Sequence, residues 1–223
     1  MNLSIIVPIL DEAPVMEPLL EHLRSLVAQG AEVLLVDGGS QDAGPALAAA
    51  AGFRVIPSER GRARQMNAGA VRAGGEILLF LHADTRLPAA ALDGVRAALT
   101  GESCWGRFDV IIEGRAPMLR VVAWLMNRRS HITGLATGDQ ALFVTRRAFE
   151  AVGGYPDQPL MEDIEISKRL LGLSRPACLP EKVSTSGRRW ESRGVWSTIL
   201  LMWRLRWAYW RGVPASRLAR DYR

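Results

Sequence analysis

The first hundred residues alternate short, mostly apolar runs with longer segments in which apolar residues recur every three or four positions. The short runs are typical of buried strands and comprise "LSIIVPIL" (3–10), "EVLLVDGG" (32–39), "FRVIPS" (53–58) and "EILLFL" (76–81). The spacing between them predicts helices over 15–27, 42–51, 62–73 and 88–100. This alternation predicts an α/β fold with a mainly parallel central sheet flanked by helices on both faces.

The pattern changes after residue 100. "CWGRFDVII" (104–112) predicts a longer strand, and "GDQALFVTRRAFEAVGGY" (138–155) a strand, a short helix and a glycine turn. "MEDIEISKRLLGL" (161–173) is typical of an amphipathic helix that opens with two acids. Because no repeat or linker divides the 223 residues, we expect one large domain with or without an appendage.

Composition and charge narrow the class of protein. The chain holds two cysteines without CxxC spacing, which argues against a disulfide framework and against a cysteine zinc site. Met1 leads directly into the first strand without a basic leader, so a cytoplasmic protein is expected. The net charge of +5 conceals an asymmetry: residues 188–223 hold nine arginines and two acids, a net of +7, which leaves −2 for the rest. Basic character confined to the tail argues against a nucleic-acid partner.

Polar residues follow three of the predicted strands, at 10–12, 37–42 and 82–85. Ligands of such sheets bind beyond the carboxyl ends of the strands, so these clusters should converge. Asp84 offers a hard oxygen ligand for Mg²⁺ or Mn²⁺, and His82 suits Mn²⁺ better or could bond a ribose or phosphate oxygen. The sequence leaves open an alternative in which Asp84 or Thr85 caps the helix after Pro88.

Further candidates lie in "VDGGSQD", "ERGRARQMNAGA" and "MEDIEISKRL". Asp37 could accept from a base N–H or a sugar hydroxyl, while Asp42 fits equally the N-cap of the next helix. Arg62 and nearby Arg64 and Asn67 stand near a helix start, where phosphate binds well, although a solvated basic face explains any single arginine there. Asp163 lies in a first helical turn, where the helix dipole favours acids, or it acts as a general base.

Taken in order, "SIIVPILDE", "LLVDGGSQD", "GRARQMNAGA", "ILLFLHADT", "FEAVGGYPD" and "MEDIEISKRL" resemble the family-2 glycosyltransferases with the GT-A fold, over roughly residues 2–172. With "TSGRRW" and a Trp/Arg-rich tail, the chain is most similar to the small bacterial selenodomain-associated, mycofactocin-type subgroup. The resemblance implies a GT-A domain over 1–187, with a nucleotide-binding half (1–100) and an acceptor half (101–187). A basic amphipathic helical extension (188–223) follows.

The implied activity is transfer of a sugar, with inversion, from a UDP- or GDP-sugar to an acceptor hydroxyl, assisted by Mn²⁺ or Mg²⁺. Asp163, which follows Glu162, matches the catalytic base, and Asp84 matches the last position of the family's Asp-x-Asp metal motif. His82 replaces the first aspartate of that motif and is a second candidate metal ligand. The resemblance assigns these residues to the nucleotide-sugar site: Pro8, Leu10, Glu12, Asp37, Gly39, Ser40, Arg62, Asn67, His82, Ala83, Asp84, Arg189 and Trp190.

The tail holds five of the seven tryptophans. On a helix, Trp196, Leu200, Trp203, Trp207 and Trp210 form one stripe, and Leu201, Met202, Leu205 and Tyr209 form a second apolar face. Interrupting arginines make it too short to span a bilayer, which takes ~20 apolar residues. Trp and Arg together suit the inner face of a membrane, while packing on the domain and on a second subunit as a homodimer remains an equal alternative.

Two other functions stay open. A sugar nucleotidyltransferase would carry a Gly-rich, Arg- and Lys-bearing loop after the first strand, which "PILDEAPVME" lacks. A nucleotide-sugar-binding protein at a membrane surface would need no base. The acceptor, whether a small molecule, a lipid or a peptide derivative, is expected to meet residues 107–139 and the neighbouring Gln140, with His131 and Asp139 as the other candidates.

Overall fold

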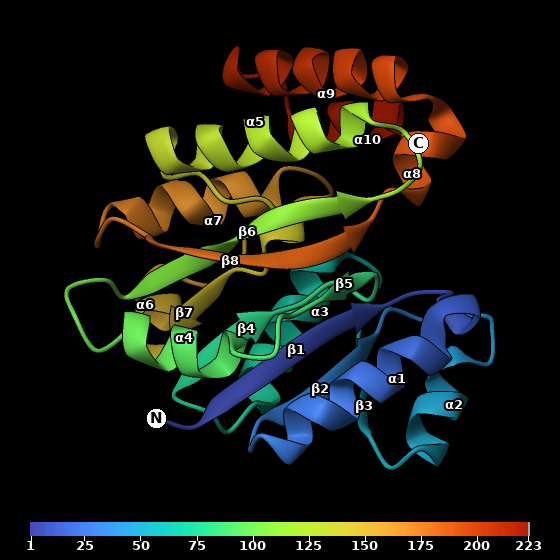
Figure 1. Cartoon of the computed structure of the whole chain (residues 1–223), viewed down its shortest axis with the longest axis vertical. Coiled ribbons are helices and arrows are strands. Elements are labelled where there is room, and N and C mark those ends of the chain that lie inside the picture. Colours follow the sequence, from blue (N-terminus) through green and yellow to red (C-terminus); the bar gives the residue numbers. More distant parts are fainter. Residues whose placement is uncertain (223) are drawn as a thin grey trace.

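The computed structural model describes residues 1–222, apart from the side chain of Arg189 (Figure 1). The described strands are β1 (Leu3–Ile9), β2 (Glu32–Asp37), β3 (Arg54–Pro57), β4 (Ile77–Phe80), β5 (Thr85–Arg86), β6 (Trp105–Glu113), β7 (Phe143–Thr145) and β8 (Ala177–Ser186). The helices are α1 (Ala13–Ala28), α2 (Gly44–Ala50), α3 (Arg62–Arg72), α4 (Ala91–Ala98), α5 (Met118–Thr133), α6 (Arg146–Ala151), α7 (Glu162–Leu171), α8 (Arg188–Arg193), α9 (Val195–Trp210) and α10 (Ala215–Tyr222), with a 3₁₀ turn at Gly138–Gln140.

The described strands form one sheet in the order β3-β2-β1-β4-β7-β6-β8-β5. The first four are parallel, as the strand–helix alternation predicts, and Ile9 at the end of β1 pairs with Asp37 at the end of β2. β7 runs antiparallel to both of its neighbours, whereas β6 and β8 are parallel. The α/β class and the mainly parallel sheet are therefore confirmed, with antiparallel pairs confined to β7 and to β5 beside β8.

Two apolar layers cover the sheet. On β1, Ile5 and Val7 join the layer of α1, α2 and α4, while Ile6 joins the layer of α3, α6 and α7. Alternate side chains of a strand point to opposite faces, so this chain order produces a sheet buried on both sides. A Cβ on Gly69 would overlap the side chain of Ile6, so glycine lets α3 lie close against β1. That close packing carries the start of α3 to the carboxyl ends of β1 and β4.

The tail folds back on the domain as α8, α9 and α10 (Figure 1). Leu205 of α9 and Leu218 of α10 pack on Leu160, Met161 and Ile164 at the start of α7, and α8 and α9 also contact α5. The predicted second apolar face therefore packs on the domain. The tryptophan stripe points outward, with exposures of 60% to 80% at Trp196, Leu200, Trp203, Trp207 and Trp210. Among residues 1–222, no helix is both long and apolar enough to cross a membrane.

Candidate active site

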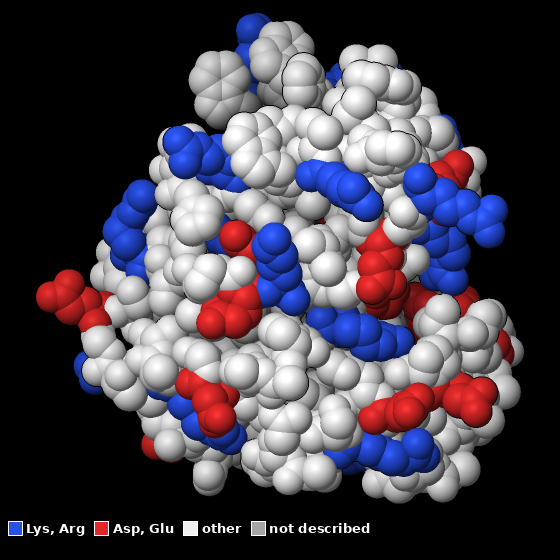
Figure 2. All heavy atoms as spheres, viewed as in Figure 1, with Lys and Arg blue, Asp and Glu red and all other residues white. Residues whose placement is uncertain are grey.

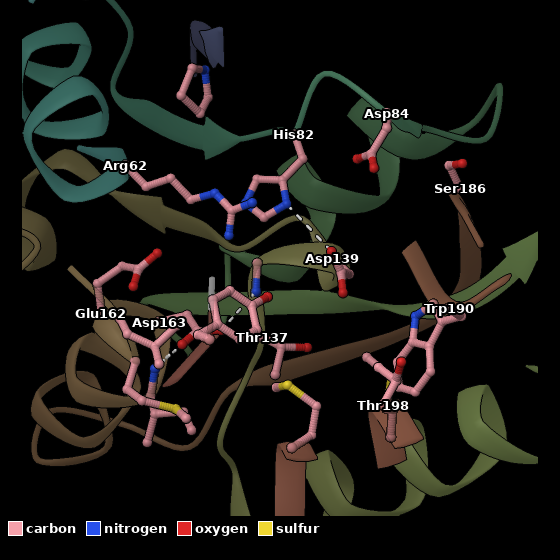
Figure 3. Close-up of a pocket in the computed structure, with 18 of the residues that line it drawn as sticks. Arg62, His82, Asp84, Thr137, Asp139, Glu162, Asp163, Ser186, Trp190 and Thr198 are labelled. Carbon is pink, nitrogen blue, oxygen red and sulfur yellow. Dashed lines mark hydrogen bonds and ion pairs between the residues drawn. The ribbon is translucent and has the colours of Figure 1, made fainter. Parts of the chain in front are cut away.

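A cavity of about 680 Å³ lies between the strand ends and the tail (Figure 3). One side, here called the strand-end wall, follows β1 and β4 and the start of α3, and includes Pro8, Leu10, Glu12, Arg62, Gln65, His82, Ala83 and Asp84. The opposite side, the helical wall, comes from α5, α8, α9 and α10 and includes Leu125, Met126, Arg129, Trp190, Ile199, Met202, Trp203, Arg206 and Tyr222. The 137–139 turn and the first turn of α7 join the two walls. Parallel strand ends thus meet helices that come from later parts of the chain, α5 (Met118–Thr133) and the tail from Arg188 onward.

The structure brings together ten of the residues predicted for the site: Pro8, Leu10, Glu12, Arg62, His82, Ala83, Asp84, Glu162, Asp163 and Trp190 line the cavity. Four others are not among its lining residues: Asp37, Gly39, Ser40 and Asn67. The side chain of Arg189 lies outside the described residues, so its assignment stays a prediction. Asp139 also lines the cavity, whereas His131 and Gln140 do not.

Asp37 and Ser40 organise the loop beside the cavity. The Asp37 carboxylate accepts hydrogen bonds from the Ser40 N–H at 3.0 Å and from its hydroxyl at 2.6 Å. Ser40 in turn accepts from the Asp11 N–H at 3.0 Å, which ties the end of β2 to the end of β1. Asp42 is not the N-cap residue of α2, which is Ala43, yet its carboxylate accepts from the Gly44 and Ala13 N–H groups. These acids fix the loops at the strand ends.

Two side-chain amides hold α3 in place. Gln65 is almost fully buried and donates from Nε2 to the carbonyl oxygens of Ile9 and Val36, both at 2.8 Å. Asn67 donates to the Tyr155 carbonyl oxygen at 2.8 Å and accepts from the Tyr155 N–H at 2.9 Å. A binding role for Asn67 stays a prediction, because the amide is engaged by backbone here. Sequence reasoning missed Gln65, although a buried amide beside two strand ends is a recognisable clamp.

Asp84 does not cap the next helix. The N-cap residue of α4 is Ala90, and no side chain bonds to the free N–H groups there, so the capping alternative for Asp84 and Thr85 is wrong. The Asp84 carboxylate instead lines the cavity next to Ser186 (Figure 3). Burial, followed by the negative charge of Asp84, raises the pKa of Glu12 above its usual value. A cation beside Glu12 and Asp84 would offset the repulsion between the two carboxylates.

His82 contacts the turn that joins the two walls. Its Nδ1 lies 3.4 Å from Oδ1 of Asp139. Desolvation acts to raise the pKa of Asp139, but the hydrogen bond from His82 and the charges of His82, Arg62 and Arg206 outweigh it, so the pKa is lowered. A Cβ on Gly138 would overlap the His82 ring, so glycine is required for this approach.

The α7 acids are held differently from one another. The Asp163 carboxylate accepts from the Gly138 N–H at 3.0 Å and from the Ile164 N–H at 2.8 Å, which fixes its orientation beside the 137–139 turn (Figure 3). Glu162 is 7% exposed, and burial, then the charge of Asp163, raises its pKa. Met161 before them adopts φ +63°, a conformation that is uncommon for a residue with a side chain. Such local strain is typical of functional sites.

Arg62 reaches across the cavity toward His82 (Figure 3). Its side chain is open to the solvent in the cavity, yet acids surround it. Desolvation acts to lower the pKa of Arg62, but Glu162, Tyr222, Asp139 and Asp163 raise it above its usual value. A permanently charged guanidinium at a helix start is suited to a phosphate ligand.

The residues present fit a divalent ion whose coordination shell is completed by the phosphate oxygens of a ligand. Within residues 1–222 there is no cluster of three or more His, Cys, Asp or Glu side chains able to hold a metal by themselves. Mg²⁺ in nucleotide sites is commonly held by one or two carboxylates together with substrate phosphates. Asp84 supplies such a carboxylate, with His82 on the same wall.

Solved structures share this fold. The mannosyltransferase PcManGT from Pyrobaculum calidifontis, in complex with GDP-Man and Mn²⁺, matches with a TM-score of 0.68 and 23% identity over 93% of this chain and 61% of that chain. TarS 1-349 from S. aureus, in complex with UDP, matches with a TM-score of 0.66 and 18% identity over 83% and 60%. Glucosyl-3-phosphoglycerate synthase from Mycobacterium tuberculosis, with Mg²⁺ and UDP, gives 0.61 and 18% over 81% and 69%. The chain thus spans 60% to 69% of the length of these proteins, and the likeness shows the fold.

The sequence itself identifies the family. A search of curated proteins finds no match. The family model described as "Glycosyl transferase family 2" matches residues 4–146, which is more than half of the chain. The matched segment includes β1, β4 and α3 of the strand-end wall and α5 of the helical wall. The chain therefore belongs to glycosyl transferase family 2.

Proposed function

We propose that this protein is an inverting glycosyltransferase that moves a sugar from a UDP- or GDP-sugar to an acceptor hydroxyl. The observation that carries the proposal is the placement of Arg62, Asp84 and Asp163 around one cavity of about 680 Å³. Such a volume lies within the range of small-molecule sites, roughly 300–1,000 Å³. The structures of related fold contain UDP, or GDP-Man with Mn²⁺, which supports a nucleotide-sugar donor here.

The donor binds along the strand-end wall. Arg62 faces the diphosphate and stabilises the negative charge that builds on it as the sugar leaves. Asp84, with His82, would hold Mn²⁺ or Mg²⁺, and such an ion would neutralise part of the same charge. Mn²⁺ or Mg²⁺ accompanies the nucleotide in two of the structures of related fold, which supports this assignment. Asp37, Gly39, Ser40 and Asn67 serve the nucleotide through the backbone of the loops that they hold.

The acceptor hydroxyl attacks from the α7 side. The acceptor oxygen forms a bond to the anomeric carbon while the bond from that carbon to the diphosphate oxygen breaks on the opposite face. The proton of the acceptor hydroxyl passes to Asp163, and the nucleoside diphosphate leaves with the electron pair of the broken bond. The fixed orientation of the Asp163 carboxylate supports this role, because a base must lie within hydrogen-bond reach of its proton. Glu162, beside Arg62, helps to place that arginine.

Substitution of the base tests the mechanism. Asp163→Asn should lower the release of nucleoside diphosphate from a panel of UDP- and GDP-sugars by at least about 100-fold, since general-base catalysis contributes 10²–10⁴-fold. The matched control is Asp93→Asn, an exposed aspartate in the first turn of α4. Full turnover in Asp163→Asn would overturn the base assignment. Nucleotide binding with no turnover in the unaltered protein would favour a nucleotide-sugar-binding protein instead.

The exposed stripe of α9 supports contact with an anionic membrane surface. Trp124 and Leu125 of α5 are also exposed, and Figure 2 shows basic side chains beside uncharged surface at the level of α5. The tail's net charge of +7 complements anionic lipid, and Trp and Arg are the residues of interfacial helices. The Trp/Arg-rich tail after "TSGRRW" likewise supports the mycofactocin-type subgroup.

Vesicle sedimentation tests this surface. We expect the protein to sediment with phosphatidylglycerol vesicles at moderate salt, and Trp203→Ser with Trp207→Ser to remain in the supernatant. If the unaltered protein does not sediment, the proposed membrane contact is wrong. If the protein instead forms a dimer in solution and the same two substitutions dissociate it, the stripe binds a second subunit.

A further inference from the structure

Two arginines on the helical wall have donor groups without partners. Arg129 of α5 and Arg206 of α9 both line the cavity. Nε and Nη2 of Arg129 and Nε of Arg206 are inaccessible to solvent, and within residues 1–222 they have no hydrogen-bond partner. A buried polar group left without a partner costs about 1–3 kcal/mol, and more when it is charged. Such groups are rare in folded proteins, and these three belong to two residues that line the same cavity.

The charges of the two arginines repel each other. Burial, followed by the charge of Arg206, lowers the pKa of Arg129 to about 10, and burial lowers the pKa of Arg206 as well. Arg62 is the opposite case on the other wall, because surrounding acids raise its pKa. An anion bound by the guanidinium groups of Arg129 and Arg206 would offset this repulsion.

The position of the pair assigns it to the acceptor. Asp163 is common to the charges that act on Arg129 and Arg206, and Leu205, which precedes Arg206, packs with Met161 and Ile164 on either side of the α7 acids. The strand-end wall already provides Arg62 and Asp84 for a diphosphate. A ligand group bound by the pair therefore lies on the side of the base, which is the side of the attacking hydroxyl.

We propose that Arg129 and Arg206 form a subsite for a phosphate monoester carried by the acceptor. This inference rests on the proposed function, because it takes Asp163 as the base. A phosphate monoester carries a charge of about −1.5 to −2 at neutral pH, which matches two guanidinium groups better than a carboxylate does. Each guanidinium can bind two phosphate oxygens at once.

The surroundings of the pair are apolar and open toward the exposed stripe. Leu125 and Met126 of α5 and Met202 and Trp203 of α9 line the same wall. Leu125 is 48% exposed and Trp203 is 65% exposed, so this lining continues to the outer surface. A phosphate on a soluble molecule and a phosphate on a lipid both fit this chemistry, and binding measurements can separate them.

Calorimetric titration of the nucleotide-free full chain tests the subsite. One arm uses sn-glycerol 3-phosphate, and the other uses dihexanoyl phosphatidic acid below its micelle concentration. We expect both to bind, and Arg129→Met and Arg206→Met each to weaken binding at least tenfold. The matched control, Arg204→Met, removes an exposed arginine of the same helix that pairs with Asp221 and should leave binding unchanged. Tighter binding of the dihexanoyl lipid assigns a lipid acceptor, and equal binding assigns a soluble one.

Stability provides a second measurement. Because each methionine variant removes buried donors without partners, its melting temperature in phosphate-free buffer should equal or exceed that of the unaltered protein, and added phosphate should no longer raise it. Three results would overturn the subsite. They are the absence of binding in both arms, unchanged binding in both methionine variants, and displacement of the phosphate probe by UDP or GDP. None of these results depends on turnover, so the proposed function can stand if the subsite fails, and the reverse also holds.

Discussion

The strand-end wall is backed by loops whose polar groups bond to nearby backbone, whereas the helical wall consists of helices in which two arginines have donor groups without partners among residues 1–222. Asp37, in the loop beside the first wall, and Gln65, on that wall, form hydrogen bonds with nearby backbone and hydroxyl groups. On the second, Arg129 and Arg206 retain free donors. A rigid wall suits a ligand of constant shape, such as a nucleoside diphosphate, and unsatisfied donors are suited to a ligand that arrives from outside. The contrast fits the proposal that one cavity binds a donor on one wall and an acceptor on the other.

Crossed substitutions give the largest expected effect. Arg62→Gln should weaken UDP or GDP binding by roughly 10–100-fold, because hydrogen bonds to charged groups contribute about 1.5–3 kcal/mol. Binding of sn-glycerol 3-phosphate should stay within twofold. Arg129→Gln should give the reverse pattern, and titration calorimetry with each ligand measures both. If either substitution weakens the binding of both ligands equally, the assignment of one ligand to each wall is wrong.

The α7 acids offer a smaller effect that depends on pH. The pKa of Glu162 in the folded protein is raised above its usual 4.5, first by burial and then by Asp163. A carboxyl group of this kind contributes stability below its unfolded pKa, and this contribution is lost as the pH rises through the folded pKa. Glu162→Gln has a neutral side chain at every pH. The difference in melting temperature, variant minus unaltered protein, should therefore increase as the pH rises from about 4 to 8.

The gain should be about 2–4 °C for each kcal/mol relieved in a chain of this size. Scanning calorimetry at several pH values measures it, with Glu150→Gln, an exposed residue of α6, as control. A difference that does not change with pH would show that the charge of Glu162 is already compensated, for example by Arg62.

The sequence predicts the strand-end wall better than the helical wall, for a physical reason. Parallel strands place their carboxyl ends at one edge, so Glu12, His82 and Asp84 could be grouped without coordinates. Asp37 and Asn67 were grouped with them, but a sequence does not reveal that nearby backbone engages their side chains.

The helical wall follows no comparable rule. On α5, Trp124 and Leu125 are exposed, which obscures the amphipathic pattern, so no helix was predicted there although residues 107–139 were expected to meet the acceptor. β8 pairs with β6 through a shift of register beside Phe108, so its sequence lacks regular alternation. Arg129 and Arg206 are 77 positions apart, and only the packing of α9 against the domain makes them neighbours.

A thermal-shift titration of nucleoside diphosphates with and without Mn²⁺ tests most directly the claim that the strand-end wall is a nucleotide-sugar site. We predict that either UDP or GDP raises the melting temperature, that Mn²⁺ increases the shift, and that Asp84→Asn removes the increase due to Mn²⁺ while the control Asp93→Asn retains it. Absence of a shift with every nucleoside diphosphate, in the presence of Mn²⁺, would contradict the account.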